Sequence, residues 1–513
     1  MRGSPHTALG VLVLVYVLNF VDRQILSILN EEIQRDLGLD DGQMGFLYGT
    51  AFAVFYAVFG IPLGRLADVW VRRTLIAASL AVWSGMTALS GLARNFVELA
   101  GARIGVGIGE AGASPAAFSM LADLYPPARR ATVLALYSSG IYLGAGLSLM
   151  IGGQIVGRWD AAWDGAAPLG LRGWQVAFFA VGLPGILLAL GVRLLPEPVR
   201  GGMEGRVAPV HPAPFRAFFE ELRAVVPPLT LWHLLATRAD GRAWAVNLGA
   251  AGLLGLAAAV LVLLSGDTLQ WSALAIGLYA AFSWSQALAR RDPPSARLIL
   301  GTPALRWLAL GFSLLAFTGY GVGYWTAPFF LRVHEVPIGR VGLLVGATAA
   351  AGWIGVAVGG WLADAWRART PRGRIWLTIV AALAPLPLLP WMLLTESTTL
   401  ALVLNVPVSM AGSMWVGVGA ATITDLVLPR MRGTASAAYL LVVTFIGLAL
   451  GPYGIGQLSD GLGDLRYAML AALVANVAGA VLLAVGARGL PAAEASLTER
   501  ARVYSEERIL HPL

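Results

Sequence analysis

The sequence predicts an all-α protein that crosses a membrane many times. Apolar residues make up 57% of the 513 residues and charged residues only 13%, with a mean hydropathy of +0.72. A soluble domain is nearer half apolar and a quarter charged, because its surface must carry charge. Apolar stretches of about 20 residues recur along the chain. Within lipid each stretch must satisfy its own backbone hydrogen bonds, so these stretches are expected to be helices.

Fourteen of these stretches are expected to span the membrane. The first six cover residues 7–29, 43–66, 74–93, 97–122, 131–156 and 174–195. Two more follow a polar segment, at 243–265 and 270–289. The last six cover residues 303–330, 340–363, 374–394, 400–427, 432–456 and 466–488. If the pair in the middle does not cross the membrane, twelve spans remain.

Repeated residues relate the first six spans to the last six. The run Gly64-Arg-Leu-Ala-Asp68 ends the second span, and Gly360-Trp-Leu-Ala-Asp364 ends its counterpart. A second set recurs without a gap, with Asp123, Arg130, Thr132 and Tyr137 matched by Asp425, Arg432, Thr434 and Tyr439. Both repeats have the same topology, so they predict two six-helix halves related by an axis along the membrane normal.

This repeat divides the chain into four expected parts. The N-terminal half covers residues 1–195 and the C-terminal half residues 303–490. Residues 196–302 form a cytoplasmic linker that includes an extra transmembrane hairpin over 243–289. Residues 491–513 are expected to form a loose cytoplasmic tail, because the segment is charged and terminal.

The linker also contains a short amphipathic pattern. Its apolar positions are Phe215, Phe218, Phe219 and Leu222, with Arg216, Glu220 and Arg223 between them. This spacing predicts a helix that lies on the inner leaflet of the membrane. The hairpin that follows is expected to turn on the outer side, near Gly266 and Asp267.

Arginine placement sets the predicted orientation. Arginines gather in the connections after the second and fourth spans of each half: Arg65, Arg72, Arg73, Arg129, Arg130, Arg367, Arg369, Arg372, Arg374, Arg430 and Arg432. The connection after the first span is acidic instead, with Glu31, Glu32, Asp36, Asp40 and Asp41. Because connections rich in positive charge stay in the cytoplasm, both termini are expected on the cytoplasmic side.

Composition also bears on source and partners. All 36 basic residues are arginine, which suggests a GC-rich bacterial genome and therefore an inner-membrane location. The net charge of +7 indicates contact with anionic lipid rather than nucleic acid, since the arginines lie between apolar spans. The chain has no cysteine and so no disulfide. Its five histidines are scattered, and we expect no metal, no cofactor and a monomer.

Three ionisable residues lie inside predicted spans. Asp22 is in the first span, and Arg103 and Glu110 are in the fourth. A charge within lipid is costly and marks a functional site by default. Seven residues of helix return to nearly the same face about 10 Å further along, so Arg103 and Glu110 can line one wall. Two plainer alternatives stay open: an ion pair that joins the two spans, and an Asp22 that is neutralised by Arg23.

Several runs resemble a known transporter family. The segment from Gly64 to Arg73 resembles the signature loop of the major facilitator superfamily. Within it, Asn19-Phe-Val-Asp22-Arg23, Arg103-Ile-Gly-Val-Gly-Ile-Gly-Glu110-Ala, Tyr324-Trp325-Thr-Ala-Pro328 and Gly451-Pro452 resemble the spinster family of lysolipid and sphingolipid transporters. The resemblance covers about 7–200 and 298–488. It implies alternating access by a rocker-switch, a lysophospholipid- or sphingolipid-like substrate, and proton coupling through Asp22.

The candidate residues therefore fall into three groups. Asp22 and Glu110 are proton-coupling candidates, and Arg103, Arg23 and Asn19 are candidate partners of substrate or carboxylate. The gating candidates lie at the cytoplasmic ends: Gly64, Asp68, Arg72, Arg73, Asp123, Arg130, Gly360, Asp364, Arg369, Asp425 and Arg432. Tyr320, Tyr324, Trp325, Trp415 and Tyr439 could line an amphipathic pocket, although core packing is the simpler explanation for any one of them.

The functional expectation is a proton-coupled secondary transporter of a small amphipathic substrate. One alternative is a proton-coupled exporter of drug-like or organic-anion molecules. Another is a lipid-scrambling or receptor-like membrane protein without coupling, which would need no titratable groups in its cavity. An enzyme is not expected, because the sequence has no His-Glu-x-x-His or Gly-x-Ser-x-Gly motif and suggests no catalytic residue.

Overall fold

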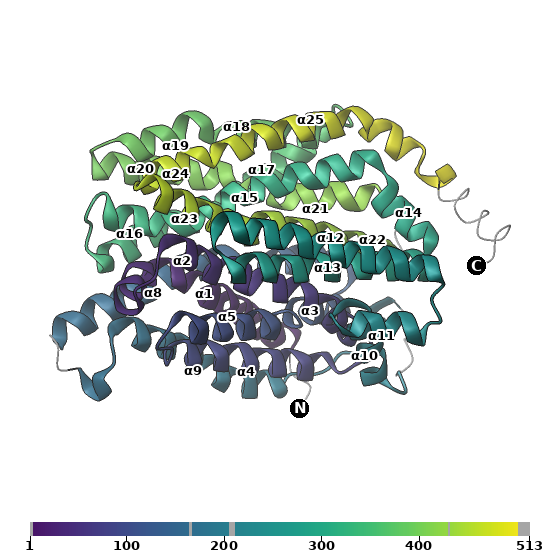
Figure 1. Ribbon diagram of the computed structural model, residues 1–513, viewed down its shortest axis with the longest axis horizontal. Coiled ribbons are helices and arrows are strands. Elements are labelled where there is room, and N and C mark those ends of the chain that lie inside the picture. Colours follow the sequence, from purple (N-terminus) through teal and green to yellow (C-terminus); the bar gives the residue numbers. More distant parts are fainter. Residues whose placement is uncertain (1–3, 164–166, 205–210, 429–430, 501–513) are drawn as a thin grey trace. The chain divides into compact units, whose positions relative to one another are not determined.

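The computed structural model describes residues 4–163, 167–204, 211–428 and 431–500, and every regular element within them is a helix (Figure 1). The predicted all-α class is thus confirmed. Eleven of the described helical segments are long and apolar enough to cross a membrane. The three further segments predicted at 74–93, 97–122 and 270–289 are helical as well, so the number of spans stays a prediction.

The helices form two compact units. Unit 1 consists of Met1–Val226 and Tyr324–Ala350, and unit 2 of Pro227–Gly323 and Ala351–Leu513. The helix that begins the second set of six spans therefore contributes to both units. The division predicted from the sequence repeat, at residues 195, 302 and 490, stays a prediction.

Unit 1 contains the first six predicted spans, and three of them are built from two helices. Span two, for instance, is interrupted at Gly49, whose backbone leaves the helical region with φ −87° and ψ −88°. The helices are α1 (Pro5–Leu37), α2 (Asp41–Tyr48), α3 (Thr50–Val69), α4 (Arg72–Ser90), α5 (Phe96–Glu110), α6 (Ala113–Leu124), α7 (Pro127–Ser138), α8 (Gly140–Ala162), α9 (Gly173–Arg193), α10 (Pro214–Val225), the end of α15 (Pro303–Arg332) and α16 (Ile338–Ala350).

Glycines allow α16 to approach α8 closely, although α16 lies far along the chain. A Cβ atom added to Gly146 would lie 2.6 Å from the carbonyl oxygen of Gly346, and one added to Gly342 would lie 2.5 Å from that of Leu149. At Gly153 the added atom would lie 2.7 Å from the Ile338 carbonyl oxygen. Small residues of this kind let helix backbones pack closely in membranes. A larger residue at these positions would push the two helices apart.

Unit 2 contains the remaining helices. They are α11 (Leu229–Ala236), α12 (Gly241–Ser265), α13 (Thr268–Arg291), α14 (Pro293–Gly301), the first part of α15, α17 (Gly352–Arg367), α18 (Gly373–Leu383), α19 (Pro385–Leu394), α20 (Thr398–Ser413), α21 (Val416–Asp425), α22 (Arg432–Val442), α23 (Leu450–Leu462), α24 (Leu465–Ala471) and α25 (Leu473–Ala495). A π-helical stretch, Val443–Ala449, joins α22 to α23.

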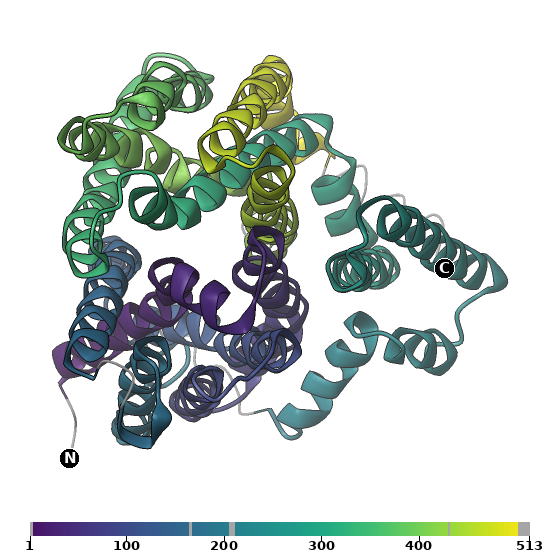
Figure 2. The same ribbon diagram turned by 60° about the vertical axis from the view of Figure 1, so that its left-hand side comes forward.

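The helices α12 and α13 pack along each other as a hairpin (Figure 2). Gly266 ends α12 with a positive φ of 80°, a conformation that glycine adopts without strain. Between the helices, the buried Asn247 amide donates to Gln286 at 2.8 Å and accepts from the Tyr279 hydroxyl at 2.6 Å. This buried polar contact fixes the register of the hairpin. That the hairpin spans the membrane stays a prediction.

Cysteine labelling tests the predicted topology. Thr268 is exposed beside the hairpin turn, and the chain has no native cysteine to react. In intact cells we expect Thr268→Cys to react with a membrane-impermeant maleimide, because the turn is predicted to face outward. Val71→Cys, in the signature loop, is the matched control and should react only in permeabilised cells. Labelling of Thr268→Cys only after permeabilisation would reject the outward-turning hairpin.

Two predictions for polar segments meet different outcomes. The amphipathic segment is helical, as α10, and its Phe215 ring packs 5.0 Å from the Trp70 ring at the end of α3.

The prediction of a loose tail from Pro491 is wrong over residues 491–500. Pro491 lies inside α25, and Glu494 forms an ion pair with Arg367 at 3.0 Å. Arg500 also donates to the Thr302 hydroxyl at 2.7 Å; residues 501–513 lie outside the described part.

Candidate functional site

Unit 1 buries all five of the polar residues predicted to act in proton and substrate binding. They lie on two helices, with Asn19, Asp22 and Arg23 on α1 and Arg103 and Glu110 on α5. Arg23 is the most exposed of them, at 7%, and Arg103 and Glu110 are fully buried. We call Asp22, Arg23, Arg103 and Glu110 the buried quartet. Its formal charges sum to zero, with two acids and two bases.

The central ion pair of the quartet joins α1 to α5. Arg23 Nη2 lies 2.6 Å from Glu110 Oε2, and Asn19 is a further polar side chain that faces this carboxyl group. Arg103 does not pair with Glu110, although the two share one face of α5. Instead its Nη1 donates to the backbone carbonyl of Asp22 at 3.3 Å. The sequence alternative of an ion pair between spans one and four is therefore realised, but by Arg23.

Aromatic rings surround the Arg23 guanidinium. Its Cζ atom lies 4.4 Å from the Phe52 ring centre, 4.8 Å from that of Phe20 and 5.2 Å from that of Tyr56. Cation–π contacts of this length stabilise a guanidinium by about 0.5–2 kcal/mol. The rings thus hold the Arg23 charge in place inside the membrane and give the site an apolar wall.

Some polar atoms of the quartet have capacity for another partner. The Asp22 carboxyl faces Trp83 and Thr87 of α4. Among the described residues, Asp22 Oδ1, Glu110 Oε1 and Arg103 Nη2 are buried and make no hydrogen bond. Buried polar atoms are nearly always hydrogen-bonded, and exceptions are concentrated at functional sites. The arrangement can take up a proton, a water molecule or a polar atom of a substrate.

A second polar cluster in unit 1 lies where α15 ends. Arg332 lies 2.6 Å from Glu31 Oε1 and 2.6 Å from Asp41 Oδ2, and its Nη2 donates to Gln34 at 2.8 Å. We call these residues, with Asn30, the Arg332 cluster. It joins α15 to α1 and α2. The acidic connection after span one is evident in the sequence, but its partner is not, because Arg332 lies about 300 residues away along the chain.

The predicted cavity aromatics belong to separate packing groups. Tyr324 and Trp325 are fully buried in unit 1, where the Asn30 amide donates to the Tyr324 hydroxyl at 2.7 Å. In unit 2, Trp415 and Tyr439 each pack against Phe312, with ring centres 6.1 and 6.0 Å from that of Phe312. The remaining one, Tyr320, is half-buried in unit 2. Core packing accounts for these buried rings within their units.

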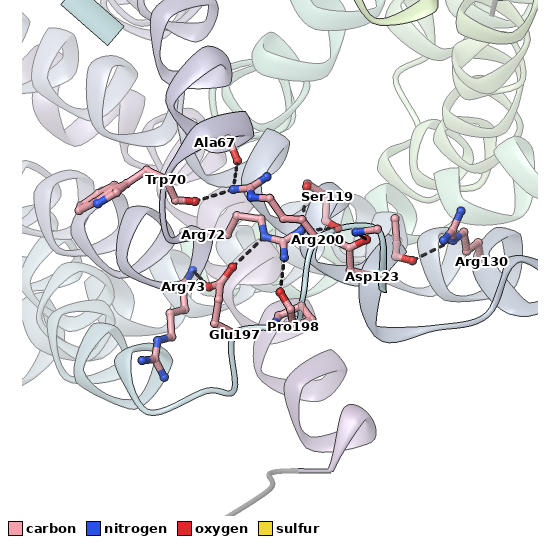
Figure 3. Close-up of polar contacts among 12 residues, drawn as sticks. Ala67, Trp70, Arg72, Arg73, Ser119, Asp123, Arg130, Glu197, Pro198 and Arg200 are labelled. Carbon is pink, nitrogen blue, oxygen red and sulfur yellow. Dashed lines mark hydrogen bonds and ion pairs between the residues drawn. The ribbon is translucent and has the colours of Figure 1, made fainter. Parts of the chain in front are cut away.

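The signature loop of unit 1 forms a dense network where α3 ends and α4 begins (Figure 3). Arg72 is fully buried and forms ion pairs with Asp123 and with Glu197, the second at 2.8 Å. It also donates to the carbonyl oxygens of Ser119 at 3.0 Å and Pro198 at 2.7 Å. Every arm of this guanidinium therefore has an acceptor, which compensates for its burial.

The linker after span six completes this network. Glu197 Oε2 accepts a hydrogen bond from the Arg73 backbone at 2.9 Å, at the N-terminus of α4. Arg200 donates to the carbonyl oxygens of Ala67 and Trp70, and the Gly201 backbone donates to Asp123 at 3.0 Å. Burial and the neighbouring Arg72 charge lower the pKa of the Arg200 guanidinium. Sequence reasoning missed Glu197 and Arg200.

Other predicted gating residues of unit 1 lie at the edge of this network. Asp68 is exposed, and its carboxylate interacts electrostatically with the Arg65 and Arg200 guanidinium groups. Arg130 donates through Nε to the Ala122 carbonyl at 2.8 Å and so ties the following connection to α6. A Cβ atom on Gly64, or on its counterpart Gly360, would meet no atom of the described residues within 4 Å. Helix packing in the described chain therefore does not explain these two glycines.

Unit 2 repeats the core of this network with a different arginine. Arg374 lies 2.6 Å from Asp425 and 2.8 Å from Asp364. The pair Arg374 and Asp425 is separated by 51 residues, as is the pair Arg72 and Asp123. Arg374 is thus the counterpart of Arg72. The arginine predicted from the sequence for this role was Arg369. Arg369 and Arg432 are exposed.

The linker contact gives a testable stability effect. Glu197→Gln should lower the free energy of unfolding by about 1–3 kcal/mol, because it removes a charged partner from a buried guanidinium. The melting temperature of the purified protein in detergent reports the change. Glu220→Gln is the matched control, since the Glu220 pair with Arg216 is exposed on both sides and such pairs contribute little. Equal melting temperatures for the two variants would contradict a structural role of Glu197.

Comparisons with known proteins agree with this architecture. The chain matches the profile of the Major Facilitator Superfamily over residues 12–291 and 283–452. An MFS-type efflux pump of Mycolicibacterium smegmatis is 29% identical over 468 residues, which cover 90% of this chain and 87% of that protein. Protein spinster of Drosophila melanogaster is 27% identical over 223 residues, 44% of this chain and 34% of that protein.

Solved structures extend the similarity to the full length. A bacterial homologue of the human lysosomal transporter Spinster, in an inward-facing and occupied conformation, is 27% identical with a TM-score of 0.67. The match covers 98% of this chain and 99% of that one. A D-xylose–proton symporter, at 16% identity and a TM-score of 0.60, shares the fold. These similarities confirm the resemblance predicted from the motifs.

Proposed function

Since the chain belongs to the Major Facilitator Superfamily, we propose that this multi-pass membrane transporter is proton-coupled and moves an amphipathic, lipid-like substrate. The observation that carries the proposal is the buried quartet: two carboxyl and two guanidinium groups, all almost completely buried within predicted spans. Such groups are costly in a membrane and are concentrated at substrate sites and proton pathways.

The ion pair between Arg23 and Glu110 supplies the coupling step. A proton taken up by Glu110 neutralises the carboxyl group and releases the Arg23 guanidinium from its partner 2.6 Å away. The quartet then carries a net positive charge and can bind an anionic or zwitterionic head group. When the proton leaves, Glu110 competes for Arg23 again and the head group is released. The substrate and the proton thus each change the affinity for the other, as coupling requires.

Alternating access requires a gate on each side of the membrane that can open and close. We assign the Arg332 cluster to the outer gate, because it joins α15 to α1 and α2. Residues 324–350 come late in the sequence, yet they pack in unit 1 against α1 and α8. We take this contact as the closed form of the outer gate. The networks around Arg72 and Arg374 hold together the predicted cytoplasmic ends of their own units.

The lipid-like class of substrate rests on two considerations. The motifs of spans one, four and seven resemble those of the spinster family. The structure is also similar, over 98% of this chain, to that of a bacterial Spinster homologue. The quartet also lies beside an apolar wall of aromatic rings, so charged and apolar groups meet at one place. An amphiphile with a charged head and an apolar chain matches this combination.

Transport by purified protein in liposomes tests the proposal. We expect a labelled lysophospholipid or phosphorylated sphingoid base to accumulate against its gradient only when a pH gradient is imposed, and the accumulation to stop when a protonophore dissipates that gradient. Substrate flux that is independent of the pH gradient would favour an uncoupled scrambling protein instead. A strict lack of response to the protonophore, with transport intact, would contradict the proton-coupling part.

One observation favours a second candidate, the export of drug-like molecules. The Mycolicibacterium smegmatis relative, which is similar over 90% of this chain, is named an efflux pump. The same liposomes can be given a lipophilic dye cation and a small organic anion, without any lipid substrate. Gradient-driven movement of these solutes together with no movement of lysolipid would favour the exporter.

A further inference from the structure

Unit 1 contains a cavity of about 370 Å³ between α8 and α9, away from the buried quartet. It lies at the end of these helices opposite the signature loop. The C-terminal end of α8 and the N-terminal end of α9 line it, whereas α9 ends beside that loop, where Arg73 donates to the Leu195 carbonyl. The arginine pattern predicts that the cavity faces the outer side of the membrane.

The rim of the cavity carries one positive charge and two indole rings. Arg158 is exposed and makes no hydrogen bond or ion pair with any residue that the structure describes. Trp159 and Trp163 flank it, with ring centres 6.1 Å apart. The Trp159 ring is fixed because its Nε1 donates to the Leu171 carbonyl at 2.9 Å. Arginine and tryptophan are the residues that proteins place at the head-group level of a bilayer.

Nearby polar groups leave the Arg158 charge uncompensated. Asp160 is close in sequence, but residues two apart do not share a helix face, and its carboxylate accepts from the Gly173 backbone at 3.1 Å. Gln154 also lines the cavity, and its amide donates to the Gly339 carbonyl at 2.7 Å. The formal charge of the cavity lining is therefore positive.

Part of the cavity lining is apolar. It consists of the half-buried Ile155 and Val176 and the exposed Ala180, which we call the apolar floor. Ala180 lies about 10 Å along α9 from its first residue at 1.5 Å per residue. A rim with a cation and indoles above an apolar floor matches a molecule with an anionic head and a hydrocarbon chain. The volume is within the range of small-molecule sites, which suits a head group with its first methylene groups.

We propose that this cavity binds an anionic phospholipid of the surrounding bilayer, with its phosphate on Arg158 and its glycerol and first methylene groups between α8 and α9. Both walls of the cavity are predicted spans, so a membrane lipid reaches it by lateral diffusion. A soluble phosphate would make no use of the apolar floor. This site is separate from the transport site, and it stands whether or not the protein moves a lipid.

Lipid titration of the delipidated protein in a mild detergent tests the site. We expect phosphatidylglycerol to raise the melting temperature, phosphatidylcholine to do so only at roughly tenfold higher concentration, and glycerol phosphate to have no effect. A tenfold difference in affinity corresponds to about 1.4 kcal/mol, which one charge-assisted contact can supply. Equal effects of the two lipids would overturn the anionic selectivity, and an equal effect of glycerol phosphate would show an anion site without a lipid.

Three variants separate the two halves of the cavity. Arg158→Gln should weaken phosphatidylglycerol binding roughly tenfold, whereas Arg158→Lys should retain most of it. Ala180→Trp fills the apolar floor, leaves Arg158 in place, and should also abolish the response to lipid. Arg94→Gln is the matched control, because Arg94 is an exposed arginine in unit 1 that does not line the cavity. Wild-type binding by both Arg158→Gln and Ala180→Trp would overturn the proposal.

Discussion

Glu110→Gln should abolish the accumulation of substrate that a pH gradient drives, while substrate still binds and still exchanges across the membrane. The amide keeps the shape of the side chain and can still accept a hydrogen bond from Arg23, but it cannot take or release a proton. The Arg23 guanidinium then loses a charged partner 2.6 Å away. The expected loss is complete for accumulation and small for exchange, because only the first needs a titrating group.

The measurement compares two liposome assays on the same protein. Accumulation under an imposed pH gradient gives the coupled rate, and counterflow of labelled against unlabelled substrate gives the exchange rate. Glu98→Gln is the matched control, since it makes the same change on the same helix at an exposed residue. Asp22→Asn provides the second test of the quartet, and at least one of the two carboxyl variants must lose coupling. Wild-type pH dependence in both variants would contradict proton coupling through the buried quartet.

The two arginines of the quartet should behave differently from the carboxyl groups. Arg23→Gln removes the partner of a fully buried carboxylate, and Arg103→Gln removes the donor to the Asp22 backbone. Arg103 also interacts electrostatically with the Asp22 carboxyl group. Each variant should therefore impair binding as well as transport, because a buried charge that loses its partner is destabilised.

The fold could be predicted from composition because the membrane leaves few options. Long apolar segments that must satisfy their own backbone hydrogen bonds can only be helices or closed barrels, and the segment lengths match helices. Breaks within spans were not predicted. Gly49 interrupts the second span, yet glycine is frequent in membrane helices, so its presence alone carries no signal.

The buried charges were predictable, but their pairing was not. Asp22 and Arg23 are adjacent in sequence, and neighbours on a helix point about 100° apart. Arg23 therefore turns away from Asp22 and reaches Glu110. Helix geometry alone argues against the alternative that Arg23 neutralises Asp22. It could not identify Glu110 as the partner, because that depends on how α1 and α5 pack.

The internal repeat could have identified Arg374 as the counterpart of Arg72. The register that relates Asp123 to Asp425 also relates Arg72 to Arg374, and both arginine–aspartate pairs are 51 residues apart. An alignment on the signature loop, with Asp68 opposite Asp364, instead places Arg369 opposite Arg73. The two registers differ because the loop before Arg374 is longer than the one before Arg72.

Arg332→Gln should open the predicted outer end of unit 1. Arg332 contacts two carboxylates and an amide at 2.6–2.8 Å. A single hydrogen bond that involves a charged group contributes about 1.5–3 kcal/mol, and we expect a net loss equivalent to about one such bond because water replaces the others in the open form. These contacts exist only while α15 is packed on α1 and α2. Their loss should shift the ratio of open to closed protein toward open by roughly tenfold to a hundredfold, in line with a loss of about 1.4–2.8 kcal/mol.

A buried cysteine can report that opening. Ser27 is fully buried and its hydroxyl donates to the Tyr324 carbonyl, so Ser27→Cys should react slowly with an impermeant thiol reagent added from outside. In the Arg332→Gln background the reaction rate should rise by the same factor as the ratio of open to closed protein. Arg35→Gln is the matched control, because the Arg35 side chain is 70% exposed and its ion pair within the described residues is with Glu32 of the same helix. Arg332→Lys should lie between wild type and Arg332→Gln, since it keeps the charge but not the planar set of donors. Equal reaction rates in the Arg332→Gln and Arg35→Gln backgrounds would mean that the cluster does not hold this end closed.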